Sequence, residues 1–184
     1  IRHERQIARR VKAARFRELK TLDDFDWQFN RSISRKQIFD MAAGAFVRET
    51  KDVLLVGPPG VGKSHIAQAV GLAIIKSGHT ALYRSIFDAI RDLLHDEAFE
   101  GHDQVMARYL KLDLLILGDM AIKQLPKRSG EFLFEIIVRR HGLRSTMMTS
   151  NRPFEDWGKL MGDVPAATAI LDRLLENADV IQIT

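Results

Sequence analysis

A glycine-rich stretch at residues 57–65 has the residue types and the spacing that bind phosphate. It reads Gly-Pro-Pro-Gly-Val-Gly-Lys-Ser-His, and its first eight residues match the pattern G-x-x-x-x-G-K-[S/T]. Glycines let the backbone curl so that N–H groups and the N-terminus of a following helix point at phosphate oxygens. The lysine would reach the β- and γ-phosphates, and the serine hydroxyl would bind Mg²⁺. The pattern predicts a P-loop for ATP, with the candidate contacts Gly57, Pro58, Pro59, Gly60, Val61, Gly62, Lys63, Ser64 and His65.

A second candidate follows the most apolar run of the chain, Asp113-Leu-Leu-Ile-Leu-Gly118-Asp119. P-loop ATPases usually have two consecutive acids here, of which the first supports Mg²⁺ and the second orients the attacking water. This chain has Gly118 in the first position and Asp119 in the second. Either Asp119 orients the water, or a local shift lets it serve the metal. Both alternatives predict slow hydrolysis with a smaller effect on nucleotide binding, while a structural Asp119 in a turn or helix cap competes with both.

The strand predicted next ends in Thr149-Ser150-Asn151. In a parallel sheet its last side chains emerge at the same edge as the P-loop, beside the γ-phosphate. Asn151 is therefore a candidate for sensing that phosphate or holding the water, and a turn-forming Asn ahead of Pro153 is the alternative.

Apolar runs and helical periodicity predict the framework that positions these residues. The expected strands cover 52–56, 81–84, 113–117, 146–149 and 180–183. The expected helices cover 1–20, 35–48, 63–77, 86–95, 103–110, 129–141 and 166–175. Alternation of strand and helix predicts a three-layer α/β fold of the P-loop NTPase type, with a five-stranded parallel sheet and right-handed crossovers. We assign residues 1–34 to a basic helical N-terminal extension and residues 35–184 to the ATP-binding domain.

Charge and composition narrow the class of protein. Residues 1–20 hold eight Lys/Arg and two Glu, a local charge of +6, whereas the whole chain carries +4. Such a basic arm suits nucleic acid, and a solvated charged helix is the alternative. The absence of cysteine excludes disulfides and thiolate metal sites and agrees with a cytoplasmic location, and no apolar run is long enough to cross a bilayer. Because the chain begins with Ile1 rather than Met and stops just after a strand-like run, we expect a trimmed fragment that also lacks a C-terminal tail.

Several stretches resemble the IstB family of transposition helper ATPases, which are close kin of the DnaC-type helicase loaders in the AAA+ class. The resemblance covers almost the entire chain. It rests on Ala13-Ala14-Arg15-Phe16, Thr21-Leu22-Asp23-Asp24-Phe25-Asp26, Gly57–Ser64, Arg144–Pro153, Asp156-Trp157-Gly158 and Ala169–Leu175.

The resemblance implies an AAA+ protein that binds ATP between adjacent subunits of a homo-oligomer. Such proteins assemble on duplex DNA and deliver it to a partner transposase. The family pattern makes Asn151 the sensor residue and Arg173 the arginine finger that reaches a neighbour's γ-phosphate. From the residues alone, Arg173 is an arginine on an amphipathic helix that can pair with Glu176. Gly118 departs from the family, which normally has an acid there.

Other basic and aromatic residues are candidate contacts. Candidate contacts for DNA phosphates are Arg91, Arg108 and Lys111, for each of which solvated surface charge is the alternative. A second basic stretch is a candidate surface for DNA or the transposase and comprises Lys123, Lys127, Arg128, Arg139, Arg140, Arg144 and Arg152. We expect binding mainly through phosphates, which makes it salt-sensitive and weakly selective for sequence. The aromatic cluster around Phe25 and Trp27 either lines an adenine pocket or packs the arm onto the body.

Three other functions remain as alternatives. A DnaC-like helicase loader is the same machine with another client, and a nucleotide-gated DNA-binding switch that barely hydrolyses ATP is motivated by Gly118. A P-loop small-molecule kinase is disfavoured, because the sequence contains no insertion like an arginine-rich lid.

Overall fold

The computed structural model of the protein describes residues 1–97 and 101–184, and within them the strands form one five-stranded parallel sheet in the order β2-β3-β4-β1-β5. The strands are β1 (Asp52–Val56), β2 (Ala81–Ser85), β3 (Leu114–Met120), β4 (Ser145–Ser150) and β5 (Ala178–Gln182). The last residue of β1, Val56, pairs with Ser150, which in turn pairs with Met120 of β3. The carboxyl ends of β1, β3 and β4 therefore meet at one edge, where the candidate residues were predicted.

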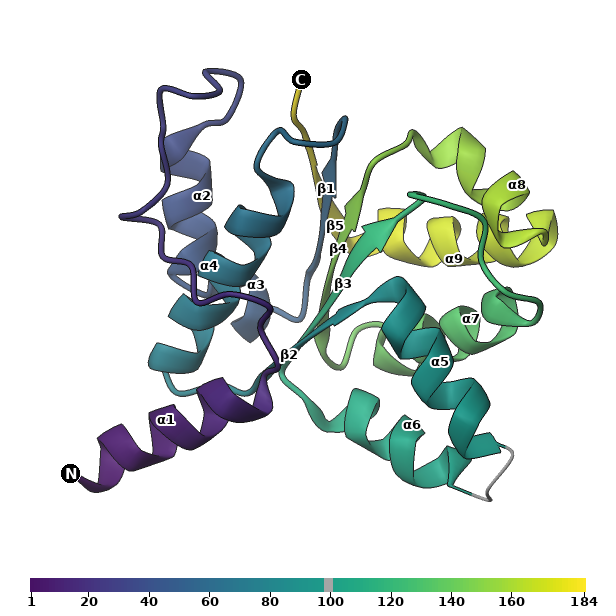
Figure 1. Cartoon of the computed structure of the whole chain (residues 1–184), viewed down its shortest axis with the longest axis horizontal. Coiled ribbons are helices and arrows are strands. Elements are labelled where there is room, and N and C mark those ends of the chain that lie inside the picture. Colours follow the sequence, from purple (N-terminus) through teal and green to yellow (C-terminus); the bar gives the residue numbers. More distant parts are fainter. Residues whose placement is uncertain (98–100) are drawn as a thin grey trace.

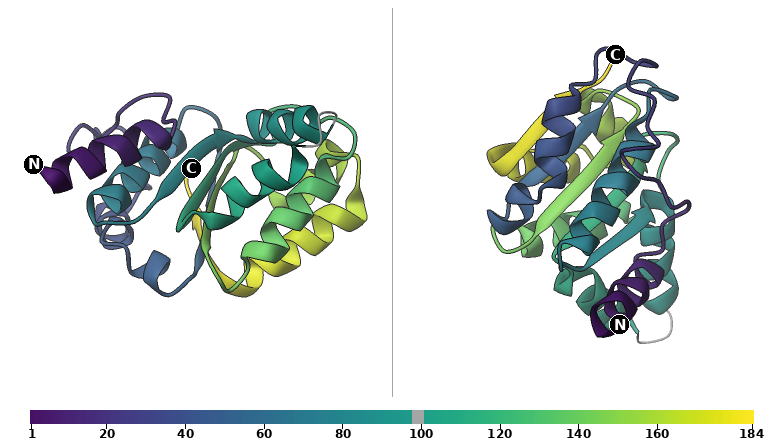
Figure 2. Two further views of the ribbon diagram at one scale, coloured as in Figure 1. Left: turned by 90° about the horizontal axis from the view of Figure 1, so that it is seen from below. Right: turned by 90° about the vertical axis from the view of Figure 1, so that its left-hand side faces the viewer.

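Helices cover both faces of this sheet, which Figure 1 shows nearly edge-on. One face is covered by α1 (Arg2–Ala13), α2 (Arg35–Ala42), α3 (Ala45–Arg48) and α4 (Lys63–Lys76). The other is covered by α5 (Ile86–Glu97), α6 (His102–Lys111), α7 (Ser129–Arg140), α8 (Trp157–Met161) and α9 (Val164–Asn177), with a short 3-10 turn, η1 (Phe154–Asp156), before α8. The view from below in Figure 2 separates the same three layers.

Successive residues of β1 divide between the two resulting cores. Val53 and Leu55 pack with α4, whereas Leu54 and Val56 pack with α5, α7 and α9. This alternation follows from the period of two along a strand, and a strand buried on both faces reads as the continuous apolar run seen in the sequence. The predicted five-stranded α/β fold is confirmed.

Several helices and one strand differ from the prediction. The single helix expected over 1–20 is wrong beyond Ala13, because the chain turns away at Arg15 (φ +56°) and the Ala14 carbonyl accepts a hydrogen bond from Tyr83 N at 2.8 Å. The helix expected over 35–48 is broken at Gly44 (φ +88°) into α2 and α3. Helix α8 was not predicted, and β3 runs past its expected end through Asp119.

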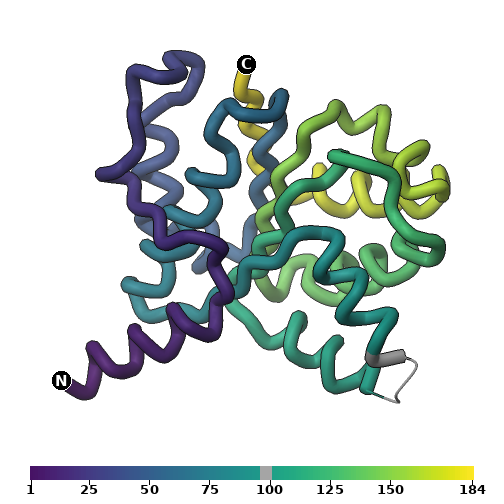
Figure 3. Tube along the Cα trace, viewed as in Figure 1, coloured from purple at the N-terminus to yellow at the C-terminus, as the bar shows by residue number. Residues whose placement is uncertain are grey.

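Residues 14–34 run from α1 along α4 toward the C-terminus of the chain, as the tube in Figure 3 shows. Leu22, Phe25 and Ile33 are buried in the core formed with β1 and α4. Asn30 Nδ2 donates to the Thr184 carbonyl at 2.9 Å. The extension is thus attached to the body, and the division at residue 34 stays a prediction. No helix in the described parts of the chain is long and apolar enough to span a membrane.

Candidate nucleotide-binding site

The glycine-rich loop lies between β1 and α4, in the strand-loop-helix setting that a P-loop requires. Two of its glycines are sterically required. A Cβ at Gly57 would lie 2.1 Å from the Ile183 carbonyl oxygen, and Gly62 has φ +104° with Phe25 ring carbon only 2.9 Å from its ideal Cβ. The loop backbone therefore packs closely against Ile183 and Phe25. The N-terminus of α4 points into the loop, where it can bind an anion.

Lys63, the first residue of α4, points back into this loop. Its Nζ donates to the carbonyls of Gly57 at 2.8 Å and Pro58 at 2.7 Å. The side chain is buried, and burial lowers the pKa of Lys63, opposed by the charge of Asp119. The ammonium group and the Asp119 carboxylate therefore belong to one electrostatic site.

Asp119 lies at a distortion of β3. The pairing of β3 with β4 shifts between Leu117 and Met120, and Asp119 has φ +63°, a left-handed conformation uncommon for a non-glycine residue. Its N–H donates to Thr149 Oγ1 at 3.0 Å. Because a bulge redirects the side chains of a strand, this distortion sets the direction of the carboxylate.

Arg17 contacts that carboxylate from the N-terminal segment, residues 14–34. Its Nη1 lies 2.9 Å from Asp119 Oδ2, with the aspartate side chain 15% exposed and the arginine 54% exposed. Arg17 was not among the predicted site residues. The only signal was its place in the basic arm, because nothing in the local sequence relates residue 17 to residue 119.

Gly118 stands against Tyr83 of the neighbouring strand β2. A Cβ at Gly118 would lie 2.7 Å from Tyr83 Oη. Burial, and then the Asp119 charge, raise the pKa of Tyr83, while Arg17 and the Ser64 hydroxyl lower it. Three side chains with oxygen atoms thus lie near one another beside the P-loop: Ser64, Tyr83 and Asp119.

Hard oxygen donors of this kind suit Mg²⁺ held together with phosphate oxygens. In the described residues, no group of three or more His, Asp or Glu side chains is placed to hold a metal ion by itself. The donors present therefore fit an ion that arrives with a triphosphate, and Ser64 and Asp119 as its protein partners stay a prediction.

Asn151 and His65 border the site in different ways. Asn151 follows β4, its N–H donates to the Met120 carbonyl at 3.1 Å, and it lines a pocket of about 430 Å³ together with Gly57 and Pro58. His65 Nε2 donates to the Thr21 carbonyl at 2.9 Å, and its ring meets Phe25 edge-on at 5.0 Å. His65 and Phe25 therefore attach the N-terminal segment to α4, and a role for His65 in nucleotide binding stays a prediction.

Arg173 does not join this cluster. It is half-exposed on α9 and pairs with Glu176 at 3.3 Å. One turn further on, Asn177 Nδ2 donates to the carbonyl of Thr50, just before β1 begins. Arg173 therefore lies toward the amino ends of the strands, on the side of the sheet opposite to the P-loop.

The candidate basic surface residues include one that is not on the surface. Arg140 is 1% exposed and donates to the carbonyls of Tyr109, Leu112 and Ser145 at 2.6–3.0 Å. The prediction that Arg140 makes an external contact is wrong, because its buried guanidinium connects α7 to the starts of β3 and β4 through hydrogen bonds. Several of the others pair with acids on the surface: Arg91 with Asp88, Arg108 with Asp92, Arg128 with Glu131, Arg139 with Glu135, Arg144 with Asp113 and Arg152 with Asp156.

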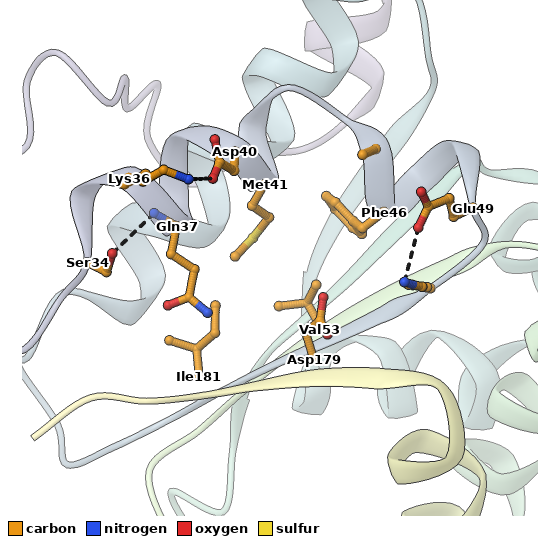
Figure 4. Close-up of a pocket in the computed structure, with 12 residues that line it drawn as sticks. Ser34, Lys36, Gln37, Asp40, Met41, Phe46, Glu49, Val53, Asp179 and Ile181 are labelled. Carbon is orange, nitrogen blue, oxygen red and sulfur yellow. Dashed lines mark hydrogen bonds and ion pairs between the residues drawn. The ribbon is translucent and has the colours of Figure 1, made fainter.

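A separate hollow of about 520 Å³ lies between α2, α3 and β5, away from the P-loop (Figure 4). Both of its lysines are paired with acids, Lys36 with Asp40 at 2.8 Å and Lys51 with Glu49 at 3.1 Å. These two ion pairs therefore leave neither lysine of the hollow free for a phosphate.

Comparison with known proteins agrees with this assignment. The sequence profile of the family described as IstB-like ATP binding protein matches residues 1–184. The insertion sequence IS21 ATP-binding protein of Pseudomonas aeruginosa is 35% identical over 182 residues, 99% of this chain and 69% of that protein. Its counterpart from insertion sequence IS232 of Bacillus thuringiensis subsp. berliner is 30% identical over 183 residues, 100% of this chain and 73% of that protein.

Solved structures resemble the chain in fold. A DnaC helicase loader superposes with a TM-score of 0.76 at 23% identity, over 94% of this chain and 100% of that one. A replication initiator DnaA bound to AMPPCP and single-stranded DNA superposes with a TM-score of 0.73 at 19% identity, over 92% of this chain and 51% of that one. The fold is that of the AAA+ P-loop proteins, as predicted.

Proposed function

Because this chain belongs to the family of IstB-like ATP binding proteins, we propose that it is an ATP-hydrolysing helper of an insertion sequence, which assembles on duplex DNA and delivers it to a partner transposase. The observation that carries the proposal is the P-loop, with buried Lys63 at the start of α4 and the Asp119 carboxylate acting on it. The insertion-sequence names of the relatives support transposition as the setting.

Each side chain of the site has a role in this proposal. Lys63 exchanges the carbonyls of Gly57 and Pro58 for phosphate oxygens, since an ammonium group binds an anion more strongly than a neutral carbonyl. Ser64 and Asp119 hold Mg²⁺, which when bound neutralises charge on the phosphates. Asn151 orients the attacking water or senses the γ-phosphate. With Gly118 in place of an acid, hydrolysis is slow, because a metal ligand or a water-orienting group is missing.

Assembly into a homo-oligomer gives Arg173 its function. Its place toward the opposite edge of the sheet keeps it from its own P-loop, so it serves a neighbouring subunit or none. A permanently charged planar guanidinium suits the oxygens of a γ-phosphate. In the proposed oligomer, Arg173 leaves Glu176 and completes the site of the adjacent subunit.

The basic helix α1 is the proposed DNA contact. None of its residues is buried, and Arg2, Arg5, Arg9 and Lys12 are all exposed. Exposed cations of this kind, for which the described residues provide no ion pair, neutralise phosphates and release counterions. A cytoplasmic location stays a prediction.

Two related functions use the same site. The fold similarity to a DnaC helicase loader keeps a loader of replicative helicases as the second candidate. A nucleotide-gated switch with little hydrolysis is favoured by Gly118 and by the ion pair of Asp119 with Arg17.

ATP turnover with and without duplex DNA tests the proposal. We expect slow turnover that rises when DNA is added and is lost in Lys63→Ala. Binding without turnover would favour the switch, and a chain that binds neither ATP nor DNA would overturn the proposal.

DNA binding is tested separately by its salt dependence. We expect the triple variant Arg2→Ala, Arg5→Ala, Arg9→Ala to weaken binding and to lower the slope of log K against log salt by up to about 3, roughly 0.9 for each lost phosphate contact. An unchanged slope would place the DNA contact elsewhere on the chain.

A further inference from the structure

Tyr83 is a buried residue whose hydroxyl makes no hydrogen bond to the described part of the chain. Its side chain is 2% exposed, and within the described residues its Oη has no hydrogen-bond partner. Leaving a buried hydroxyl unpaired is costly, so such a group in a folded protein needs an explanation. The other tyrosine of the chain, Tyr109, is equally buried but donates to Asp92 Oδ2 at 2.7 Å. The unpaired phenol is therefore a property of one position and not of tyrosines in this fold.

The position of that hydroxyl coincides with the irregular part of the nucleotide site. Strand β2 pairs with β3, and the ideal Cβ of Gly118 would lie 2.7 Å from Tyr83 Oη and 3.1 Å from Cζ. The phenol thus occupies the space into which the first acidic side chain of a usual P-loop ATPase would extend. Gly118 and Tyr83 are sterically coupled, because no side chain fits at residue 118 while the ring stays in place.

The groups around the phenol are those expected to meet the triphosphate and its metal. The charge of Asp119 raises the pKa of Tyr83 and the Ser64 hydroxyl lowers it, while the guanidinium of Arg17 lies 5.9 Å from the centre of its ring. Ser64 is the serine of the P-loop pattern. The unpaired hydroxyl therefore lies near groups that the proposed function assigns to the nucleotide and its metal.

We propose that Tyr83 is a positioning residue of the nucleotide site, whose hydroxyl takes the place of the missing first acid by hydrogen-bonding to the solvent shell of Mg²⁺ on bound ATP. The inference rests on the proposed ATP-binding function. A phenol accepts a hydrogen bond from metal-bound water through its oxygen, as a carboxylate does, but it adds no negative charge. Tyr83 therefore explains how the site can keep its metal-nucleotide geometry with Gly118 in the chain.

The matched variants Tyr83→Phe and Tyr109→Phe test this role, because each removes one phenol oxygen and keeps the ring. In Tyr83→Phe we expect the Kd for ATP to rise about 3- to 10-fold with saturating Mg²⁺, the effect of one hydrogen bond, and to stay unchanged with EDTA. The thermal midpoint of the protein without nucleotide should hold or rise by about 2–4 °C, because an unpaired hydroxyl is removed. Tyr109→Phe should show the opposite: a lower midpoint and unchanged ATP affinity.

A spectroscopic readout separates hydrogen bonding from altered shape. Tyrosine labelled with ¹³C at Cζ gives two resonances, which the two variants assign. We expect the Tyr83 resonance to shift when ATP and Mg²⁺ are added together, and the Tyr109 resonance to stay. Equal ATP affinity of Tyr83→Phe and the unaltered chain at every Mg²⁺ concentration, with a static Tyr83 resonance, would overturn this inference alone. Failure of the unaltered chain to bind ATP would overturn the proposed function and this inference with it.

Discussion

The two sides of the nucleotide site are built differently. The P-loop, Gly57–Ser64, is continuous in sequence, and it takes its shape from glycines and from the strand and helix that it joins. The end of β3 is assembled from distant segments: Asp119 is held by Arg17 of the N-terminal segment and by Thr149 of β4, and Gly118 stands against Tyr83 of β2.

This difference indicates which substitutions a P-loop protein can accept. The loop supplies backbone groups, for which side chains of other elements cannot substitute. The strand end supplies side-chain oxygens, and a neighbouring strand can place another oxygen in the same space. A departure from the usual pattern at residue 118 is therefore tolerable where one at residue 57 or 62 is not.

Loss of the P-loop lysine is the largest expected effect. We expect Lys63→Ala to weaken ATP binding about 1,000-fold, because two charge-assisted contacts to phosphate disappear. Isothermal titration measures the change. Lys76→Ala, at the exposed end of the same helix, is the control and should bind ATP normally. A small effect of Lys63→Ala would remove the distinction between the two sides of the site.

Crowding of the loop backbone comes next. Gly57→Ala should lower the free energy of unfolding by about 3 kcal/mol, because its Cβ meets a backbone carbonyl that cannot rotate away. Gly60→Ala is the control, since Gly60 has φ +81° but nothing within 4 Å of the added Cβ. It should lose only about 1 kcal/mol from the left-handed conformation. Urea unfolding distinguishes the two, and equal losses would mean that the loop is not constrained by Ile183.

Substitution of Gly118 tests the other side. Gly118→Ala should lower the free energy of unfolding by about 2 kcal/mol, because the added Cβ lies 2.7 Å from Tyr83 Oη. Adding Tyr83→Val should recover about 1 kcal/mol of the free energy of unfolding in a double-mutant cycle.

The same steric obstruction leads to a prediction for ATP turnover. Gly118→Asp alone should not raise turnover, whereas Gly118→Asp combined with Tyr83→Val should raise it. A gain from Gly118→Asp alone would show that the tyrosine does not obstruct the position.

Removal of Arg17 has the smallest expected effect. The arginine is half-exposed, so its pairing with Asp119 should contribute only about 0.5 kcal/mol to the free energy of unfolding. A double-mutant cycle of Arg17→Ala with Asp119→Ala measures this coupling, which 1 M salt should remove because the screening length falls to about 3 Å. Coupling that persists in salt would identify a buried, permanent contact instead.

Local patterns predicted most of the framework. The five strands and the parallel sheet follow from short apolar runs that alternate with amphipathic helices, and the P-loop lies in its expected place. The errors occur where a long-range contact overrides a local preference. The helix expected over 1–20 stops because the Ala14 carbonyl pairs with Tyr83 N at the free edge of β2. The buried environment of Arg140 likewise depends on carbonyls from other elements.

Adjacent residues in the right order were enough to predict the phosphate-binding loop, because an anion site made of successive backbone N–H groups needs nothing more. The absence of an acid at residue 118 is visible in the same way. What stands against Gly118, and the contact of Arg17 with Asp119, became visible only in the folded chain. Those contacts join residues 35 and 102 positions apart in the chain. Side chains so far apart meet only after the sheet has formed and brought β2, β3 and the N-terminal segment to the same edge.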